Sequence, residues 1–336
     1  MAFAKMRFLG LKGSIPAMQM RLRPRWLAAW GLVAACGLLL ACAPAPTGTP
    51  AAAPAEATRP GAATPAEAVT DLVGHLRQNE LAEIARAALP PALHAEVEAA
   101  WRRGESRWPL TELPLDDSIP GMLAALTRPA AEEQLRVAYR RQLSGQTRAM
   151  QDAARGLGVF GKEYLGREGR YNAQQRQHYM QLVDRVASWA AQAPLGDPER
   201  GRQSIALLVK GAERSGVKGD DDFTRLGMEG SLKALVPLYI AFKQMLGLYG
   251  LGVDATLAGL EAETVSTEGD AAEVRVRYQL DGREIQTVIH ASRVEGRWYL
   301  TDYLDAARES TLRPEADHTA VEPAATEPAA PDPAGG

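Results

Sequence analysis

Apolar residues recur with helical spacing over most of residues 65–252. The first helix is signalled by Thr64-Pro65-Ala66-Glu67, which joins a capping residue, a proline at the first helical position and a glutamate three residues after the cap. Apolar spacing, capping residues and stop residues predict further helices over residues 81–89, 93–101, 119–126, 129–143, 146–165, 172–189 and 197–216. Residues 231–250 are apolar nearly all round, so we expect them to form the central buried helix.

The hydrophobic pattern changes after Leu260 from a helical period to a period of two. Four apolar residues alternate with polar ones, as in a half-buried strand: Val274, Val276, Tyr278 and Leu280. Asp281-Gly282 is typical of a two-residue hairpin turn, and Glu295-Gly296 predicts a second hairpin. The register that the first turn imposes pairs Tyr278 with Ile285, Val276 with Thr287 and Val274 with Ile289.

Together these patterns predict an α+β fold. A predominantly helical body, residues 65–252, is followed by a C-terminal four-stranded antiparallel β-meander within residues 253–312. The outer strands are expected at residues 261–267 and 297–303, and one face of the sheet should pack on helices.

Two stretches resemble a known superfamily. The closing VRVRYQLDGREIQTVIHASRVEGRWYLTDY looks like the last strands of NTF2-like and cystatin-like domains of exported bacterial proteins. The opening PAEAVTDLVGHLRQNEL resembles the first helix of that superfamily. The helical residues between the two stretches are either a large insertion in such a fold or a separate helical domain.

The resemblance implies a pocket for a small apolar ligand on the concave face of the sheet. The candidate pocket residues lie on neighbouring predicted strands: Tyr278, His290, Tyr299 and Asp302. The alternative is plain cross-strand packing of the aromatic side chains, with a polar outer face. Strict alternation also places Tyr278 and His290 on opposite faces unless a bulge intervenes.

Residues 1–41 predict export. They contain six Lys and Arg and no Asp or Glu, and the run from Trp26 to Ala41 is uncharged, which is the layout of a secretory signal peptide. The uncharged run is shorter than the roughly 20 residues needed to span a bilayer. Because 25 residues precede this run, translation could also start at Met20.

The end of the signal resembles a lipobox. Leu39-Leu40-Ala41-Cys42 has the pattern of bacterial lipoprotein signals, and the whole chain resembles uncharacterised lipoproteins of Gram-negative bacteria. The resemblance implies cleavage before Cys42 and a lipid anchor on that cysteine, with Cys36 as the alternative. Ala43, rather than an aspartate, follows the cysteine, which implies sorting to the outer membrane on its periplasmic side.

Composition narrows the chemistry. Cys36 and Cys42 are the only cysteines, so the mature chain can form neither a disulfide framework nor a cysteine-ligated metal site. After residue 41 the chain carries 32 Lys and Arg against 41 Asp and Glu, with no basic cluster. This argues against nucleic acid as a partner and against an electrostatic hold on anionic lipid. Residues 42–64 and 313–336 are rich in Pro and Ala, which predicts a disordered tether and a disordered acidic tail.

Local motifs indicate no assembled catalytic site. Residues 156–161 read GxGxxG, but a helical pattern precedes them, so a loop or a close helix contact is favoured over a dinucleotide site. Ser215 and Lys218 match S-x-x-K, yet Ser215 closes a predicted helix instead of opening one. Asp220-Asp221-Asp222 is expected to cap a helix, not to bind calcium. The histidines show no metal-ligand spacing and are expected on helix surfaces or at caps: His75, His94, His178, His290 and His318.

These patterns lead to a functional expectation. We expect a membrane-anchored periplasmic domain, non-enzymatic and without cofactor or metal, that binds a partner protein or an envelope component. The alternative is an NTF2-like pocket on the C-terminal sheet that binds a small molecule and could be catalytic.

Overall fold

The computed structural model describes residues 60–113, 118–167 and 172–312. The predictions for Cys36, Cys42, the signal peptide and the acidic tail lie outside the described residues. Within them, a helical body precedes a C-terminal antiparallel sheet, which confirms the α+β prediction. No helix of this described part is long and apolar enough to cross a membrane.

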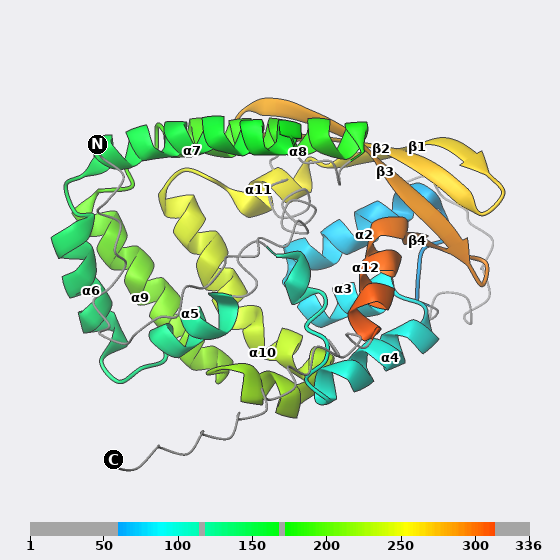
Figure 1. Ribbon diagram of the computed structural model, residues 1–336, viewed down its shortest axis with the longest axis horizontal. Coiled ribbons are helices and arrows are strands. Elements are labelled where there is room, and N and C mark those ends of the chain that lie inside the picture. The colour runs from blue at the N-terminus through cyan, green and yellow to red at the C-terminus, as the bar shows by residue number, and fades with distance from the viewer. Residues whose placement is uncertain (1–59, 114–117, 168–171, 313–336) are drawn as a thin grey trace, which may run out of the picture.

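Most of the helical body consists of helices that the sequence predicted. The helices before the sheet are α2 (Pro65–Gln78), α3 (Leu81–Ala88), α4 (Pro91–Arg102), the 3-10 turn η2 (Leu110–Glu112), α5 (Ile119–Leu126), α6 (Ala131–Gln142), α7 (Thr147–Arg167), α8 (Ala173–Ala190), α9 (Pro198–Ser215), α10 (Asp220–Leu248) and α11 (Val253–Ala258). Capping boxes open α2 at Thr64 and α8 at Asn172, because each side chain accepts a hydrogen bond from the backbone three residues later. Figure 1 shows α7 and α8 along one long edge, with α2, α3, α4 and α12 gathered near the sheet.

The sheet is a meander in chain order. Its strands are β1 (Glu261–Glu268), β2 (Ala271–Leu280), β3 (Arg283–Val294) and β4 (Arg297–Leu300). Asp281 and Gly282 have φ angles of 50° and 70°, as a type I′ turn requires. The predicted register is confirmed in all three pairs: Tyr278 with Ile285, Val276 with Thr287 and Val274 with Ile289.

The prediction of a strand over residues 297–303 is wrong at its end. The strand stops at Leu300, and residues Thr301–Thr311 form the helix α12. Leu304 and Ala307 are spaced three residues apart and are both buried, so a helical period takes over there. The side chain of Tyr303 meets Trp108 edge to face, at 6.0 Å between ring centroids, which anchors α12 on the loop after α4.

The predicted tether is ordered over its last five residues. Ala62 is buried and exchanges two backbone hydrogen bonds of 3.0 Å with Trp298 of β4. The guanidinium of Arg297 donates two hydrogen bonds to the Gly61 carbonyl. The chain before α2 therefore extends the sheet beyond β4. Residues 60–64 belong to the fold and not to a disordered tether.

Helix α10 is less buried than the sequence suggested. It is interrupted at Gly227 (φ 72°, ψ −175°), and the helix as a whole packs against α9, α4 and α3. Leu232, Leu235 and Leu238 are buried, but Phe242 is 38% exposed, so one side of this apolar helix faces outward. The buried apolar residues of the helices and of the sheet form one contiguous core cluster.

Candidate functional site

The predicted pocket on the sheet is filled at Tyr278. This residue lies on the face of β2 that packs on helices, and only 2% of its surface is exposed. Its hydroxyl lies 2.9 Å from His178 Nε2 on α8, and the two rings meet edge to face. Burial raises the pKa of Tyr278, so the hydroxyl stays protonated.

The other candidate pocket residues lie apart from Tyr278. His290 pairs with Glu273 in the ladder and therefore points to the opposite face of the sheet. Tyr299 donates its hydroxyl to the Pro60 carbonyl at 2.9 Å, so it holds the segment before α2.

Asp302 lies in the first turn of α12, where Gln175 hydrogen-bonds to its carboxyl. Asp302 is exposed by its accessible surface, yet the protein atoms around it desolvate the carboxyl and raise its pKa against the opposing effects of His290 and Gln175. The fold thus brings Asp302 near His290 but does not bring the four candidates together around one pocket.

His178 is the site residue that sequence reasoning missed. The prediction of a surface or capping histidine is wrong, because His178 is only 8% exposed. Burial lowers its pKa to about 4, so it is neutral at neutral pH. The sequence signal for its burial was its position four residues before Leu182, which places it on the buried stripe of α8. The pair of His178 and Tyr278 joins α8 to the sheet.

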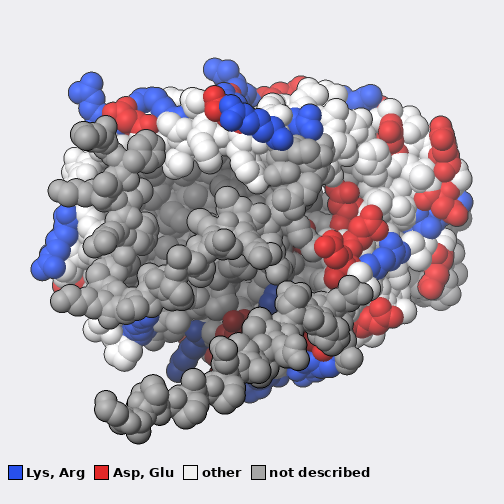
Figure 2. Space-filling view, viewed as in Figure 1, with Lys and Arg blue, Asp and Glu red and all other residues white. Residues whose placement is uncertain are grey.

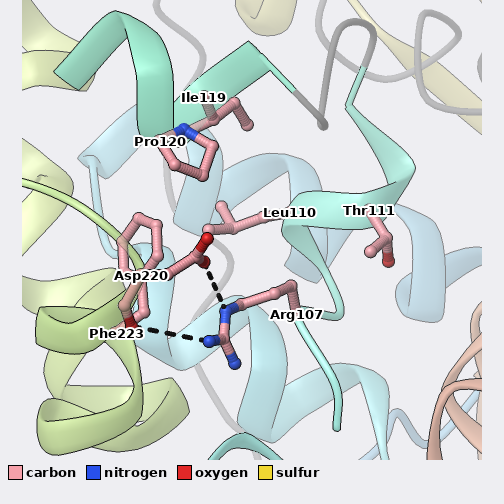
Figure 3. A pocket seen from close by; sticks show the side chains of 7 residues that line it. All are labelled: Arg107, Leu110, Thr111, Ile119, Pro120, Asp220 and Phe223. Atoms are coloured by element: carbon pink, nitrogen blue, oxygen red, sulfur yellow. Dashed lines mark hydrogen bonds and ion pairs between the residues drawn. The ribbon is translucent and has the colours of Figure 1, made fainter. Parts of the chain in front are cut away.

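A small hollow lies beside Arg107 (Figure 3), with a volume of about 250 Å³. Its lining residues are Arg107, Leu110, Thr111, Ile119, Pro120, Asp220 and Phe223. The Arg107 guanidinium donates to the Thr224 hydroxyl at 2.9 Å and to the Ser106 carbonyl at 2.8 Å, and lies 3.3 Å from the Asp220 carboxylate. These hydrogen bonds occupy the guanidinium of Arg107, so this residue links the loop after α4 to α10.

An ion cluster joins α3, α4 and α10. Arg86 contacts the carboxylates of Glu83 and Glu229, and His94 Nε2 lies 3.5 Å from Glu229. Hydrogen bonding from Arg86 lowers the pKa of Glu229, and desolvation lowers that of His94. The hollow beside Arg107 is not lined by these groups, so the role of the cluster is to cross-link the three helices.

Two sequence motifs have structural roles. Ser215 is buried at the end of α9 and donates to the Ala212 carbonyl at 2.7 Å, which excludes the helix-opening geometry of an S-x-x-K nucleophile. The N-cap of α10 is Gly219, not an aspartate as expected, and the three aspartates form the first helical turn. Among the residues that the structure describes, no group of three His, Cys, Asp or Glu could hold a metal ion.

The GxGxxG motif forms a close helix contact inside α7, as the sequence favoured. A Cβ on Gly158 would lie 2.5 Å from the Cβ of Ala187, and one on Gly161 would lie 3.1 Å from Val183. The two glycines therefore let α7 approach α8 closely. We call these two helices, residues 147–167 and 173–190, the α7–α8 arm.

The outer side of α7 carries exposed apolar residues. Leu157, Val159 and Phe160 are 69%, 59% and 66% exposed, and we call these three residues the apolar edge. At about 100° per residue, Phe160 points away from the seam with α8 that Gly158 occupies. α7 packs extensively on α8 alone among the described elements. The apolar edge is thus a surface that the described fold does not cover.

The arm is also basic. The residues of the two helices contain six Lys and Arg against three Asp and Glu, whereas the rest of the chain after Cys42 contains 26 against 38. Figure 2 shows Lys and Arg along the edge where Figure 1 places α7 and α8, and acidic side chains mostly on the right.

An open groove of about 420 Å³ lies between α7 and α8. Three cations line it, with one acid and several uncharged residues: Lys162, Arg176 and Arg185, with Asp184, Ala173, Gln177, Met180 and Gln181. The hydrogen bond from Lys162 lowers the pKa of Asp184, which stays ionised. Lys162 and Arg185 both pair with Asp184, and the shallow form of the groove suits contact with an extended surface better than enclosure of a small molecule.

Protein-family models, curated proteins and solved structures were compared with this chain, and none matches it.

Proposed function

We propose that this chain is a membrane-anchored lipoprotein of the bacterial envelope whose folded domain binds another envelope molecule and catalyses no reaction. The observation that carries the binding role is the apolar edge of α7. Leu157 and Phe160 lie one helical turn apart, and exposed apolar surface that a fold leaves uncovered can mark an interaction site. The address rests on the signal layout and on Cys42 in the sequence.

The proposed anchor would keep the proposed binding surface close to the membrane. With the fold ordered from residue 60, the predicted tether from residue 43 to 59 has 17 residues. As a coil it would span on the order of 23 Å, so the domain would stay close to the membrane. A surface held there meets envelope partners at high effective concentration, and modest affinity suffices.

Metabolic labelling tests the anchor. Labelled palmitate should enter the wild-type chain and not Cys42→Ser, whereas Cys36→Ser should label normally. Equal labelling of wild type and Cys42→Ser would contradict an anchor at Cys42, and labelling lost only in Cys36→Ser would move it to Cys36.

Photo-cross-linking in whole cells tests the binding surface. A benzophenone amino acid at Phe160 should give adducts in the full-length lipidated chain. The matched control places the same group at Phe242, an exposed phenylalanine on α10. Equal adduct yields at the two positions, or none at Phe160, would contradict the assignment of binding to the arm.

A further inference from the structure

One face of α7 has the spacing of a coiled-coil seam. Its residues follow one another at intervals of three, four, three and four, as the apolar positions of a heptad repeat do: Met150, Ala153, Leu157, Phe160 and Tyr164. We call these five residues the α7 stripe. At about 100° per residue they fall within about 80° of the helix circumference. So narrow a stripe is typical of pairing with one other helix rather than of packing on a broad core.

The α7 stripe is open in the part of the chain that the structure describes. Leu157 and Phe160 are 69% and 66% exposed. Met150 and Tyr164 are only partly buried. The seam with α8 runs through Gly158, roughly a third of a turn from the middle of the stripe. A further helix can therefore lie on the stripe without displacing α8.

The positions beside the stripe carry almost no charge. In coiled coils, charged residues at these flanking positions set the choice of partner. On α7 the flanking positions hold four small residues and one acid: Ala149, Ala154, Gly156, Gly161 and Glu163. The cations Arg148, Arg155 and Lys162 lie roughly 160–180° from the middle of the stripe, on the far side of the helix. No row of charge beside the stripe therefore calls for a partner of opposite sign.

A second copy of α7 suits this surface. Two copies related by a two-fold axis present the same stripe to each other, so the interface is self-complementary. The flanking Glu163 lies 3.7 Å from Arg167 of its own helix, so pairing two copies brings little like charge together. The rest of the chain is strongly acidic and would repel a copy over most other surfaces. The small flanking residues also let two helices approach closely.

We propose that α7 pairs with α7 of a second copy through the α7 stripe, which makes the protein a dimer on the membrane. This inference rests on the proposed function and identifies the partner of the apolar edge as the same chain. Leu157 and Phe160 lie in the interface, whereas Val159 lies roughly 140° from the middle of the stripe and outside it.

Confinement to the membrane supports this pairing. The five stripe residues of each copy are few beside the roughly 20–30 residues that each partner contributes to a stable complex. The lipid anchors would hold two copies on one surface and so raise their effective concentration. The unlipidated chain is expected to be largely monomeric at low micromolar concentration.

Cysteine cross-linking in vesicles tests the pairing. The mature chain has no cysteine besides Cys42, whose sulfur would carry the lipid, so an introduced cysteine is the only free thiol. The full lipidated chain with Leu157→Cys is reconstituted into vesicles of phosphatidylethanolamine and phosphatidylglycerol and treated with a short bismaleimide. Cross-linked dimer should form, and its yield should fall as added lipid dilutes the protein.

Arg155→Cys is the matched control for the position of the thiol. It lies on the same helix, on the side away from the stripe, and the side chain it replaces is 58% exposed. This variant should give at least fivefold less dimer than Leu157→Cys. A monofunctional maleimide should label both cysteines equally, which shows that the two thiols are equally accessible.

A second pair of variants tests the stripe itself. In the Leu157→Cys chain, Phe160→Glu should reduce the dimer at least fivefold, because it brings two like charges into the interface. Val159→Glu alters another exposed apolar residue of α7 and should leave the yield unchanged. Mixing copies that carry Phe160→Glu with copies that carry Phe160→Lys should restore the dimer. Circular dichroism of each variant confirms that the fold is retained.

Three outcomes overturn the inference. They are equal dimer yields from Leu157→Cys and Arg155→Cys, a yield that Phe160→Glu leaves unchanged, and the absence of dimer in vesicles. If adducts from Phe160 in cells then contain a different protein, the proposed function stands with another partner. If Phe160 gives no adducts at all, the proposed function fails as well. Palmitate labelling is measured separately, so a wrong anchor is not mistaken for a wrong interface.

Discussion

The sheet and the α7–α8 arm use similar side chains in opposite ways. On β2, Val274, Tyr278 and Leu280 are almost completely buried, because α2, α8 and α11 cover that face. On α7, Leu157 and Phe160 are mostly exposed. Both regions have strong local periodicity, so the difference lies in what the rest of the fold supplies as a partner.

The comparison separates the parts of the molecule that hold the fold from the part left open for binding. α8 reaches the body through the His178–Tyr278 pair and through Trp189, which donates to the Tyr249 carbonyl at 2.9 Å. α7 is attached mainly through the glycine seam with α8. The body should therefore dominate the free energy of unfolding, while changes at the outer side of α7 should leave it nearly unchanged.

The largest expected effect is in the body, at Trp101. Its side chain is fully buried, donates to the Trp108 carbonyl at 2.6 Å and packs edge to face on Phe223. Trp101→Ala should lower the free energy of unfolding by about 3–5 kcal/mol, measured by urea denaturation. Trp101→Phe, which keeps most of the packing but not the hydrogen bond, should lose less. A loss below about 1 kcal/mol for the alanine variant would contradict a cooperative core around α4.

The contact between arm and sheet should make stability depend on pH. Because burial holds the pKa of His178 at about 4, below the ordinary value of about 6.5, the unfolded chain binds a proton between these pH values that the folded chain does not. Stability should therefore fall as pH drops through this window, by up to about 3 kcal/mol, and should be flat above it.

The His178→Gln variant is the control for this pH dependence of stability. It should remove most of the difference between denaturation free energies at pH 7 and pH 4.5, although His94, whose pKa is also lowered, keeps a residual slope in both proteins. An identical pH dependence in wild type and variant would mean that His178 is not buried as a neutral side chain.

Alanine substitutions at two glycines of α7 compare the seam with the outer side of the helix directly. A methyl group at Gly158 would clash with Ala187, so Gly158→Ala should destabilise the arm by about 1–3 kcal/mol. Nothing lies within 4 Å of a methyl group at Gly156, so Gly156→Ala should stabilise the helix by up to about 1 kcal/mol. Far-UV circular dichroism during urea denaturation measures both changes. Equal effects of the two substitutions would contradict the close seam.

Local chemistry explains which parts of the fold the sequence predicted. The turn Asp281-Gly282 and the alternation of β2 fix a register by themselves, and the capping boxes at Thr64 and Asn172 fix helix starts. The end of β4 could not be read in this way, because Trp298 and Leu300 continue the alternation up to the residue where α12 begins. The helical spacing of Leu304 and Ala307 begins only after that point, and packing on Trp108 and α4 stabilises the helix there.

The candidate site was harder to predict because its partners are distant in the sequence. Tyr278 meets His178 from 100 residues away, so neither residue reveals a buried pair locally. The GxGxxG spacing indicated a close helix contact, but it could not show that the other side of the same helix lacks a partner. Exposure of an apolar residue is a property of the whole fold, and periodicity alone assigns such a residue to the core.

The smallest expected effect on stability tests the comparison most directly. Leu157→Ser and Phe160→Ser should each change the free energy of unfolding by no more than about 0.5 kcal/mol, because little apolar surface is buried at these positions. Urea denaturation of the unlipidated mature chain, without vesicles, measures this. A loss of 2 kcal/mol or more, as a buried leucine would give, would mean that the apolar edge is covered within the protein in solution. The arm would then belong with the sheet as part of the core, and its exposed side could not serve as a binding surface.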